Sequence, residues 1–349
     1  MNNKVLLAMS GGIDSSISVQ YLINGGFDVT GTTFNMIDNN CKSFNSSING
    51  IISDIVNFYN IKHIFVDVSE DFNNHVICKF IDDYIGGKTP NPCTICNKDI
   101  KFKYLNQIAQ VEDCYHIATG HYARIDSQDG RYFIKKGIDK TKDQSYFLWK
   151  LSQDVLSKTI FPLGNTLKKN NKILAQEIGL DKYTQQEESN DICFLKNDSY
   201  REFLLRLVPS LKDLHGGDLV YHGKVVGNHD GYPFYTIGQR SGIGVAVGHP
   251  VFVQSIDCKT NVITLCDEEE LYTNEMIVSN VNLQKYENIN EYECTVKIRY
   301  RDVGHKALLK KKENGKILCS FYEQVKAITP GQSAVFYEDD DVIGGGIIN

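Results

Sequence analysis

Apolar and polar positions alternate along the first part of the chain in blocks that predict strands and helices. Residues 4–9, KVLLAM, are continuously apolar, which is typical of a strand buried on both faces of a parallel sheet. Residues 14–26 then predict an amphipathic helix, with Val19, Leu22 and Ile23 as its inward stripe. The chain therefore opens with a strand, a polar loop and a helix.

The same alternation continues through the next hundred residues. Residues 27–34 and 61–68 predict two further strands, and residues 51–60 predict a helix between them. Residues 114–125, CYHIATGHYARI, predict another strand that leaves through a glycine turn. Strands that alternate with helices imply a doubly wound, Rossmann-like parallel sheet, whose ligands bind at the carboxyl ends of the strands.

The pattern changes after the first two hundred residues. From Gly216 the chain is rich in glycine, turns and short strands, and from about Glu270 it consists of strands separated by turns, which predicts an all-β barrel. The expected fold class is therefore α/β, with a small central β-rich domain and a C-terminal β-barrel. We place these three domains at residues 1–205, 206–268 and 269–349.

Composition indicates which cellular compartment and which kinds of partner to expect. The 349 residues are 42% hydrophobic and 23% charged, which is ordinary for a globular protein of two or three domains. No apolar run reaches the length of a membrane span, and the N-terminus resembles neither a secretion signal nor a transit peptide. We therefore expect a cytoplasmic protein without a membrane partner, in which the ten cysteines do not form a disulfide framework. A net charge of −6 does not exclude nucleic acid, because local patches decide binding.

The loop SGGIDSS, residues 10–16, carries more polar and glycine residues than a simple turn needs. Glycines let backbone N–H groups turn inward, serine hydroxyls add donors, and the helix N-terminus adds positive potential, so the loop suits a phosphate. The plainer interpretation is that Asp14 only caps the helix. The loop fits neither a Walker A nor a dinucleotide fingerprint. It resembles the PP-loop, SGGxDS, of ATP pyrophosphatases.

Cys93 and Cys96 form a C-x-x-C within the segment TPNPCTICNKDIKF. Zinc would need a second ligand pair, and a thioredoxin-like dithiol fits the flanking sequence poorly, so a single reactive thiol is the third alternative. Cys96 precedes Lys98, Lys101 and Lys103 near the expected start of a helix, and both features would lower a thiol pKa. Cys193, in the hydrophobic island ICFL, would by itself be interpreted as a buried strand cysteine.

Eight motifs in order give a far more specific signal than any one of them. Over nearly the whole chain they resemble the tRNA-specific 2-thiouridylases of the MnmA family. The motifs are SGGIDSS, TPNPCTICNKDIKF, ATGHYARI, TKDQSYFLW, SNDICFL, FYTIGQRSGIG, VKIRYR and ITPGQSAVFY. The resemblance implies an enzyme that uses ATP and Mg²⁺ to replace the C2 oxygen of the wobble uridine of tRNA by sulfur, giving 2-thiouridine, AMP and pyrophosphate. It also implies a protein sulfur donor, either a cysteine desulfurase or a sulfur relay protein.

The resemblance further implies roles for individual residues. Cys193 would carry a persulfide and Cys96 would be the nucleophilic partner, with a Cys96–Cys193 disulfide left after transfer and then reduced externally. Direct attack of the persulfide on the base is an equally compatible order. The residues that would bind ATP are Ala8, Met9, Ser10, Gly11, Gly12, Ile13, Asp14, Ser15, Phe34 and Gly120. The residues that would bind tRNA are Asn91, Pro92, Cys93, His121, Lys142, Asp143, Gln144, Arg299, Tyr300 and Gln332.

One departure from the family pattern, one basic segment and two alternative functions stay open. Many relatives have Asp at Cys93, so its contact with the target base is in doubt, and a third thiol also keeps an iron–sulfur thiolase possible. The residues at 297–316 are strongly basic, which fits either phosphate binding or a solvated hairpin. Another PP-loop enzyme, such as an amidating ligase or a thiolase for a different base, is one alternative function. An RNA-binding protein with a vestigial loop is the other.

Overall fold

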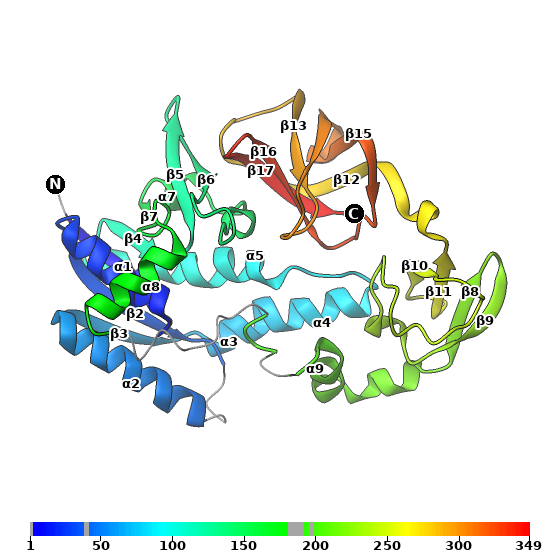
Figure 1. The fold of residues 1–349 in the computed structure, drawn as a ribbon, viewed down its shortest axis with the longest axis horizontal. Coiled ribbons are helices and arrows are strands. Elements are labelled where there is room, and N and C mark those ends of the chain that lie inside the picture. Colours follow the sequence, from blue (N-terminus) through cyan, green and yellow to red (C-terminus); the bar gives the residue numbers. More distant parts are fainter. Residues whose placement is uncertain (1–2, 38–41, 181–191, 196–197) are drawn as a thin grey trace.

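The computed structural model describes residues 3–37, 42–180, 192–195 and 198–349. An α/β unit, a small β unit and a closed barrel follow one another along the chain (Figure 1). The α/β class, the central β-rich part and the C-terminal barrel expected from the sequence are all confirmed. Residues 189–191 of the SNDICFL motif lie outside the described residues.

Five parallel strands form the N-terminal sheet, in the order β3-β2-β1-β4-β7. They are β1 (Lys4–Ala8), β2 (Asp28–Asn35), β3 (Lys62–Asp67), β4 (His116–Thr119) and β7 (Thr159–Ile160). The chain builds outward from β1 in one direction through β2 and β3, and in the other through β4 and β7. The strand order therefore reverses between β1 and β4, which is where open parallel sheets bind ligands.

Helices cover both faces of this sheet because the side chains of β1 alternate between the two faces. Val5 and Leu7 pack in one cluster with Ile17, Ile52 and Ala175, whereas Leu6 packs in another cluster with Leu105. The first face is covered by α1 (Ile13–Asn24), α2 (Lys42–Tyr59) and α8 (Lys168–Glu177), and α6 (Lys103–Val111) covers the second. Helices α1 and α8 lie side by side (Figure 1).

The expected inward stripe of α1 was only partly right. Val19 and Leu22 are buried, but Ile23 is 37% exposed. Helix α1 ends at Asn24 with Gly25 as its C-cap, and Leu22 is the last residue of its buried face.

A long helical connection joins β3 to β4 and contains two π-helical turns. Its elements are α3 (Ser69–Phe72), η1 (Asn73–Ile77), α4 (Cys78–Ile85), α5 (Pro92–Cys96) and η2 (Asn97–Phe102), which continues into α6. A π turn widens the helix by one residue per hydrogen-bonded ring and is frequent at functional sites. Here η2 starts directly after Cys96, within the predicted site segment.

The central unit is small and consists of three short helical elements and a four-stranded sheet of order β10-β11-β8-β9. Its elements are α9 (Tyr200–Leu207), η5 (Pro209–Leu214), β8 (Gly217–Tyr221), β9 (Lys224–His229), η6 (Tyr232–Phe234), β10 (Phe252–Asp257) and β11 (Val262–Cys266). Phe203, Leu219 and Val253 of this unit share one buried cluster with Phe80 and Cys96. The central unit therefore packs directly against the helical connection.

The C-terminal unit closes into a barrel because β12 pairs with both β15 and β17. Its elements are η7 (Glu268–Leu271), β12 (Tyr272–Leu283), β13 (Glu291–Lys297), β14 (His305–Lys311), η8 (Glu313–Gly315), β15 (Ile317–Lys326), β16 (Ser333–Glu338) and β17 (Asp341–Ile348). The hairpin of β5 (Ala123–Gln128) and β6 (Arg131–Lys136), which follows β4, adds to β17 through Lys135 and Asp341. The barrel is thus joined to the α/β unit.

A short segment between β6 and β7 fixes the barrel to the α/β unit. It comprises η3 (Ser145–Phe147) and the turn before α7 (Gln153–Leu156). Trp149 is fully buried against Gly345, where an added Cβ would lie 2.9 Å from the indole ring. Gln284 of the barrel donates to the carbonyls of Leu148 (2.9 Å) and Trp149 (3.1 Å) and accepts from the Ile134 N–H (3.2 Å).

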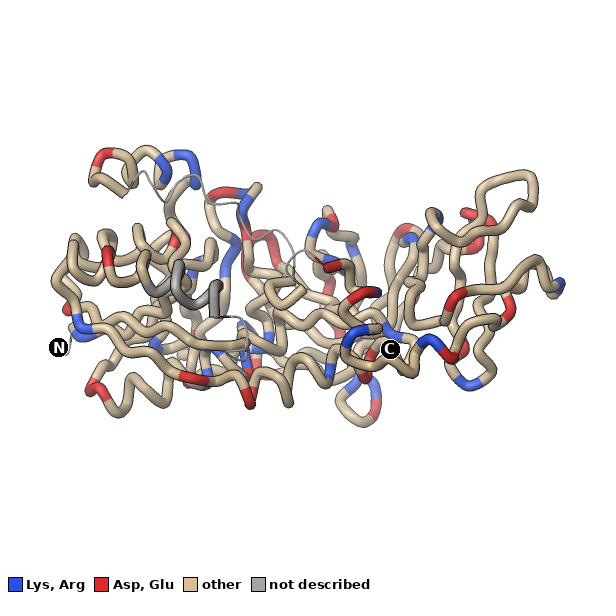
Figure 2. Tube along the Cα trace, turned by 90° about the horizontal axis from the view of Figure 1, so that it is seen from below, with Lys and Arg blue, Asp and Glu red and all other residues tan. Residues whose placement is uncertain are grey.

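Basic and acidic residues are interspersed along the whole described chain (Figure 2). Within the described residues, no helix is long and apolar enough to cross a membrane.

Replacing Gln284, which is completely buried, tests this attachment. The substitution Gln284→Leu leaves one N–H and two carbonyls without their partner, so we expect a melting temperature about 5–10 °C below that of the unchanged protein. Thermal unfolding followed by circular dichroism measures it. The exposed Gln110→Leu serves as the control, and equal melting temperatures of the two variants would show that this contact does not hold the barrel in place.

Candidate active site

The loop after β1 forms a backbone cradle at the start of α1. Gly11 has a φ of +79°, a left-handed conformation that favours glycine, and Gly12 caps the helix without a side-chain hydrogen bond. The first N–H groups of a helix have no intrahelical acceptor, and the helix dipole is positive there. This geometry has the features that the predicted phosphate cradle requires.

Serine hydroxyls hold the loop in this shape. Ser15 Oγ donates to the Gly12 carbonyl (2.8 Å) and accepts from the Ser10 N–H (3.3 Å). Ser16 Oγ donates to the same carbonyl at 3.1 Å. Ser15 and Ser16 are buried, whereas Ser10 is exposed, so Ser10 presents its hydroxyl to solvent and to any ligand.

Asp14 does not cap α1, so the plainer interpretation of this residue was wrong. Its two carboxylate oxygens each lie 2.7 Å from Lys168 Nζ, and one of them accepts from the Tyr122 hydroxyl at 2.8 Å. Lys168 is almost completely buried and begins α8. The sequence did not indicate Lys168, because nothing in the stretch LKKNN separates it from the exposed Lys169. Its partner becomes visible only when α8 packs against α1.

The loops after β1 and β4 meet because their strands are paired neighbours. Leu7 pairs with Ala118 and Ala8 with Thr119, so the two chains leave the sheet side by side. Gly120 then approaches the start of α1 so closely that a Cβ would lie 3.3 Å from the backbone of Asp14 and Ser15. The expected placement of Gly120 at the nucleotide cradle is therefore supported by its position.

Other members of the predicted ATP set contribute in different ways. Phe34 is the second-last residue of β2, the strand next to β1, and is partly buried, with its ring centre 6.3 Å from that of Tyr104. Met9 and Ile13 point into the core between the sheet and its helices, and Ala8 is only partly buried at the end of β1. Met9 and Ile13 can therefore reach a ligand through their backbone alone.

The three site cysteines come together in space. Cys96 is buried in the cluster that also holds Phe194, Cys93 is half-buried one helical turn earlier, and Cys193 is exposed in a turn. A charge on Cys193 would raise the pKa of both Cys93 and Cys96, which places the three thiols within electrostatic reach of one another. The described cysteines are all free thiols.

Burial has a larger effect on the pKa values of these thiols than the nearby lysines have. Removal from water raises the pKa of Cys96 to about 12 and also raises the pKa values of Cys93 and Cys193. The positive charge of Lys101 opposes this increase at all three thiols. The expectation of a lowered pKa at Cys96 was therefore wrong, because Cys96 packs among apolar side chains at the end of α5 rather than at an open helix start.

His121 follows β4 and packs against η2, the helical turn that begins directly after Cys96. Its Nδ1 lies 2.7 Å from Thr119 Oγ1, and its ring stacks on Phe102 of η2 with 6.3 Å between ring centres. Burial, with a smaller effect of Lys101, lowers the pKa of His121 to about 3, so the imidazole is neutral near pH 7. The charge of Lys101 acts on the pKa of His121 and on those of the three thiols.

A barrel loop holds the segment before the cysteines. Gln332 Nε2 donates to the carbonyls of Thr89 (2.9 Å) and Pro90 (3.2 Å), and the Thr89 N–H donates to Pro330 at 3.0 Å. Asn91 follows directly as the N-cap of α5, and Pro92 is its first residue. Gln332 is therefore placed next to Asn91, Pro92 and Cys93, with its amide N–H groups used inside the protein.

The polar residues 142–144 lie where the α/β unit meets the barrel. Asp143 accepts from the N–H groups of Gly137 (3.1 Å) and Ser145 (3.2 Å) and from Ser145 Oγ (2.9 Å), and its burial raises its pKa. Gln144 Oε1 accepts from the Tyr122 N–H at 3.0 Å. Both side chains thus hold this loop in place, and Lys142 is partly exposed.

Arg299 and Tyr300 lie across from that loop. The Tyr300 ring centre is 4.5 Å from that of Phe147, and Arg299 donates to the Lys326 carbonyl at 3.1 Å. Both residues are exposed. The structure therefore brings the two predicted tRNA segments, far apart in the sequence, to the same junction. Most of the basic side chains at 297–316 are exposed, namely Arg299, Arg301, Lys306, Lys311, Lys312 and Lys316.

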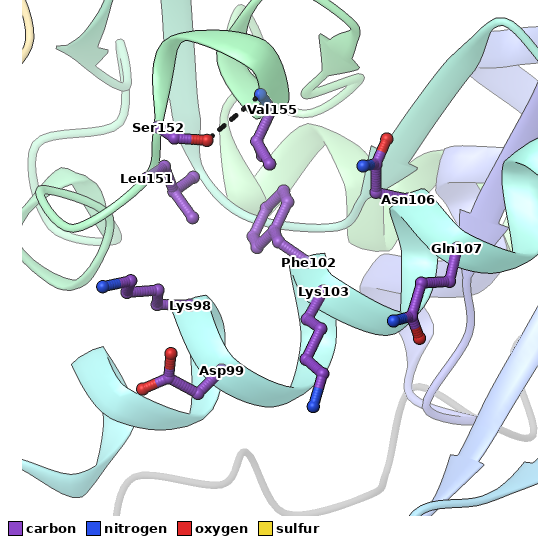
Figure 3. Close-up of a pocket in the computed structure, with 9 residues that line it drawn as sticks. All are labelled: Lys98, Asp99, Phe102, Lys103, Asn106, Gln107, Leu151, Ser152 and Val155. Carbon is purple, nitrogen blue, oxygen red and sulfur yellow. Dashed lines mark hydrogen bonds between the residues drawn. The ribbon is translucent and has the colours of Figure 1, made fainter.

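A cavity of about 300 Å³ lies on the other side of η2, between α6 and the turn before α7 (Figure 3). It is lined by Lys98, Asp99, Phe102, Lys103, Asn106, Gln107, Leu151, Ser152 and Val155. None of the predicted catalytic or ligand-binding residues lines it. Phe102 both lines this cavity and stacks on His121.

Comparison with known proteins covers almost the whole chain. Residues 3–197 match the family described as the tRNA methyl transferase HUP domain, residues 202–267 its PRC-barrel domain, and residues 273–348 the aminomethyltransferase beta-barrel domain. A solved 4-thiouridine synthetase–RNA complex with bound ATP has 18% identity and a TM-score of 0.38, covering 60% of this chain and 51% of that chain. That likeness is too low to add to the argument.

Curated relatives are much more similar. A Cytophaga hutchinsonii protein named tRNA-specific 2-thiouridylase MnmA is 43% identical over 99% of this chain and 97% of its own length. Proteins of the same name from Amoebophilus asiaticus and Salinibacter ruber are each 42% identical over 99% of this chain, covering 95% and 94% of their own lengths. At this level of identity over nearly its whole length, the chain belongs to the family of tRNA-specific 2-thiouridylases.

Proposed function

We propose that this protein is an enzyme that uses ATP to replace the C2 oxygen of the wobble uridine of tRNA by sulfur. The observation that carries the proposal is that a loop suited to phosphate and a set of thiols lie on connected elements of the fold. A glycine loop suited to phosphate precedes α1, and Gly120 of the neighbouring strand end packs against it. His121 stacks on Phe102 of η2, the turn that begins directly after Cys96. An amidating ligase would need the cradle but no thiols.

The cradle would serve the first step. The uracil C2 oxygen attacks the α-phosphorus of ATP, the bond between the α-phosphorus and the bridging oxygen breaks, and pyrophosphate leaves. The N–H groups at the start of α1 and the Ser10 hydroxyl are placed to hold phosphate oxygens. Mg²⁺ would neutralise charge on the leaving pyrophosphate, and the Asp14 carboxylate, both of whose oxygens pair with Lys168, is not assigned to hold it.

The thiols would serve the second step. Cys193 is exposed, so a sulfur-donor protein can reach it and leave a persulfide there. Its outer sulfur is transferred to C2 and AMP departs, while Cys96 forms a disulfide with the Cys193 sulfur and loses its proton. Whether Cys96 attacks before or after the new C–S bond forms, the products are 2-thiouridine, AMP, and a disulfide that an external reductant opens.

The barrel junction would bind the tRNA. Arg299, Tyr300 and Lys142 surround the point where the barrel meets the α/β unit, beside the segment Asn91–Cys93 that would face the target base. Phosphate contacts by exposed basic side chains position a nucleic acid without reading its sequence. The wobble base must leave the anticodon stack to reach this site.

Pyrophosphate release tests the first step. With unmodified tRNA and ATP, the unchanged protein should release pyrophosphate and AMP, and Ser10→Ala should be slower by about 100-fold because one phosphate donor is lost. Ser10 is exposed, so its substitution should leave folding intact, and the exposed Ser127→Ala is the matched control. Formation of ADP and phosphate by the unchanged protein would contradict the proposal.

Sulfur loading separates the roles of the cysteines. Cys193→Ser should fail to retain labelled sulfur from a cysteine desulfurase. Cys96→Ser should load sulfur yet form no 2-thiouridine. Cys93→Ser should keep much of its activity, because Cys93 lies one helical turn before Cys96 but has no assigned step.

Labelled-sulfur retention and nucleoside mass spectrometry measure the two steps on each variant. Normal loading of Cys193→Ser would reverse the assignment of carrier and partner. Complete loss of activity in Cys93→Ser would point instead to a metal or cluster held by the three thiols.

A further inference from the structure

Lys168 is a buried cation placed directly behind the phosphate cradle. Only 6% of the residue is exposed, and its ammonium lies 2.7 Å from both carboxylate oxygens of Asp14. Asp14 is the second residue of α1, which begins at Ile13 directly after the Gly12 N-cap. The ammonium is therefore held within the first turn of the helix whose N-terminus forms the cradle.

Neighbouring groups fix Lys168 at both ends. Its backbone N–H donates to Asp139 Oδ2 at 2.9 Å, at the start of α8. On the other side, the Tyr122 hydroxyl donates to Asp14 (2.8 Å) and accepts from Asn171 Nδ2 (2.9 Å). Asn171 also accepts from the Tyr21 hydroxyl at 3.0 Å. This network ties α8 to α1 and to the segment after β4, so the ion pair is preorganised.

Stability alone is a weak reason for such a pair. Desolvating two charges costs about as much as their attraction returns, and apolar replacements are often neutral or stabilising. A bare carboxylate in the first turn would also repel a polyphosphate that approaches the cradle. The ammonium removes that repulsion, and it is the kind of group that binds phosphate as a point charge.

We propose that Lys168 binds the β- and γ-phosphates of ATP, the part that leaves as pyrophosphate, and that Asp14 holds its ammonium in position for this contact. The inference rests on the proposed function in that it assigns a residue to the ATP site. When the nucleotide enters, the ammonium shares its hydrogen bonds between Asp14 and phosphate oxygens. Lys168 thereby stabilises the negative charge that grows on pyrophosphate as the phosphorus–oxygen bond breaks.

Nucleotide binding without tRNA tests this assignment. Equilibrium dialysis with labelled ATP and labelled AMP, each with Mg²⁺, gives two dissociation constants for each variant. Lys168→Met should weaken ATP binding by about 10- to 100-fold, the loss of one charge-assisted hydrogen bond, and change AMP binding less than threefold. Lys168→Arg should restore most of the ATP affinity. The neighbouring exposed Lys169→Met is the matched control and should bind both nucleotides normally.

A second pair of variants separates phosphate binding from simple neutralisation of Asp14. The double variant Asp14→Asn with Lys168→Met buries no unpaired charge, so it should fold even where Lys168→Met alone does not. Compared with Asp14→Asn, it should still bind ATP about 10-fold or more weakly. Equal ATP affinity of these two variants, or an equal loss of ATP and AMP binding in Lys168→Met, would overturn the proposal.

The phosphate contact of Lys168 and the proposed reaction can fail independently of each other. If the unchanged protein binds ATP through Lys168 but releases no pyrophosphate with tRNA, the reaction assignment fails and the phosphate contact remains. If pyrophosphate release is normal while Lys168→Met binds ATP as tightly as the unchanged protein, the reaction assignment stands and the phosphate contact of Lys168 is excluded.

Discussion

The pairing of β1 with β4 is the constraint on which the site depends. Their backbones lie side by side up to Ala8 and Thr119, and the sheet then extends in opposite directions from this pair. The two loops that follow have no strand between them, so they must share the same space. Gly120 shows how tightly they share it, because any Cβ there would press on the backbone of Asp14 and Ser15. The phosphate cradle is therefore a consequence of sheet topology as much as of the glycine loop.

Attachment of the barrel extends this constraint to the other half of the site. Trp149 packs into the space left by Gly345, and Gln332 holds the chain just before Asn91. The thiols of α5 and the segment at Arg299 are thus positioned by one interface. Burial raises the pKa of the Cys96 thiol and makes it a poor nucleophile at rest, and the charge of Lys101 acts against this increase.

Local patterns predicted most of the fold. The apolar run before Met9, the glycine loop and the turn-rich strands near the C-terminus each carry their own signal, and the structure has the elements they predict. The environment of Cys96 could not be predicted, because it depends on a core built from Phe194 and the central unit. Lys168 was missed for the same reason, since a buried ion pair between two helices leaves no mark in either helix's sequence.

The central claim is that the cradle and the thiols act on the same C2 carbonyl group of the wobble uridine. Purified protein, unmodified tRNA, ATP, and a cysteine desulfurase with labelled cysteine would be combined, and the tRNA nucleosides analysed by mass spectrometry. The account predicts labelled 2-thiouridine at the wobble position, with one AMP formed for each sulfur transferred. Sulfur at any other atom or position, or 2-thiouridine formed without ATP, would contradict it.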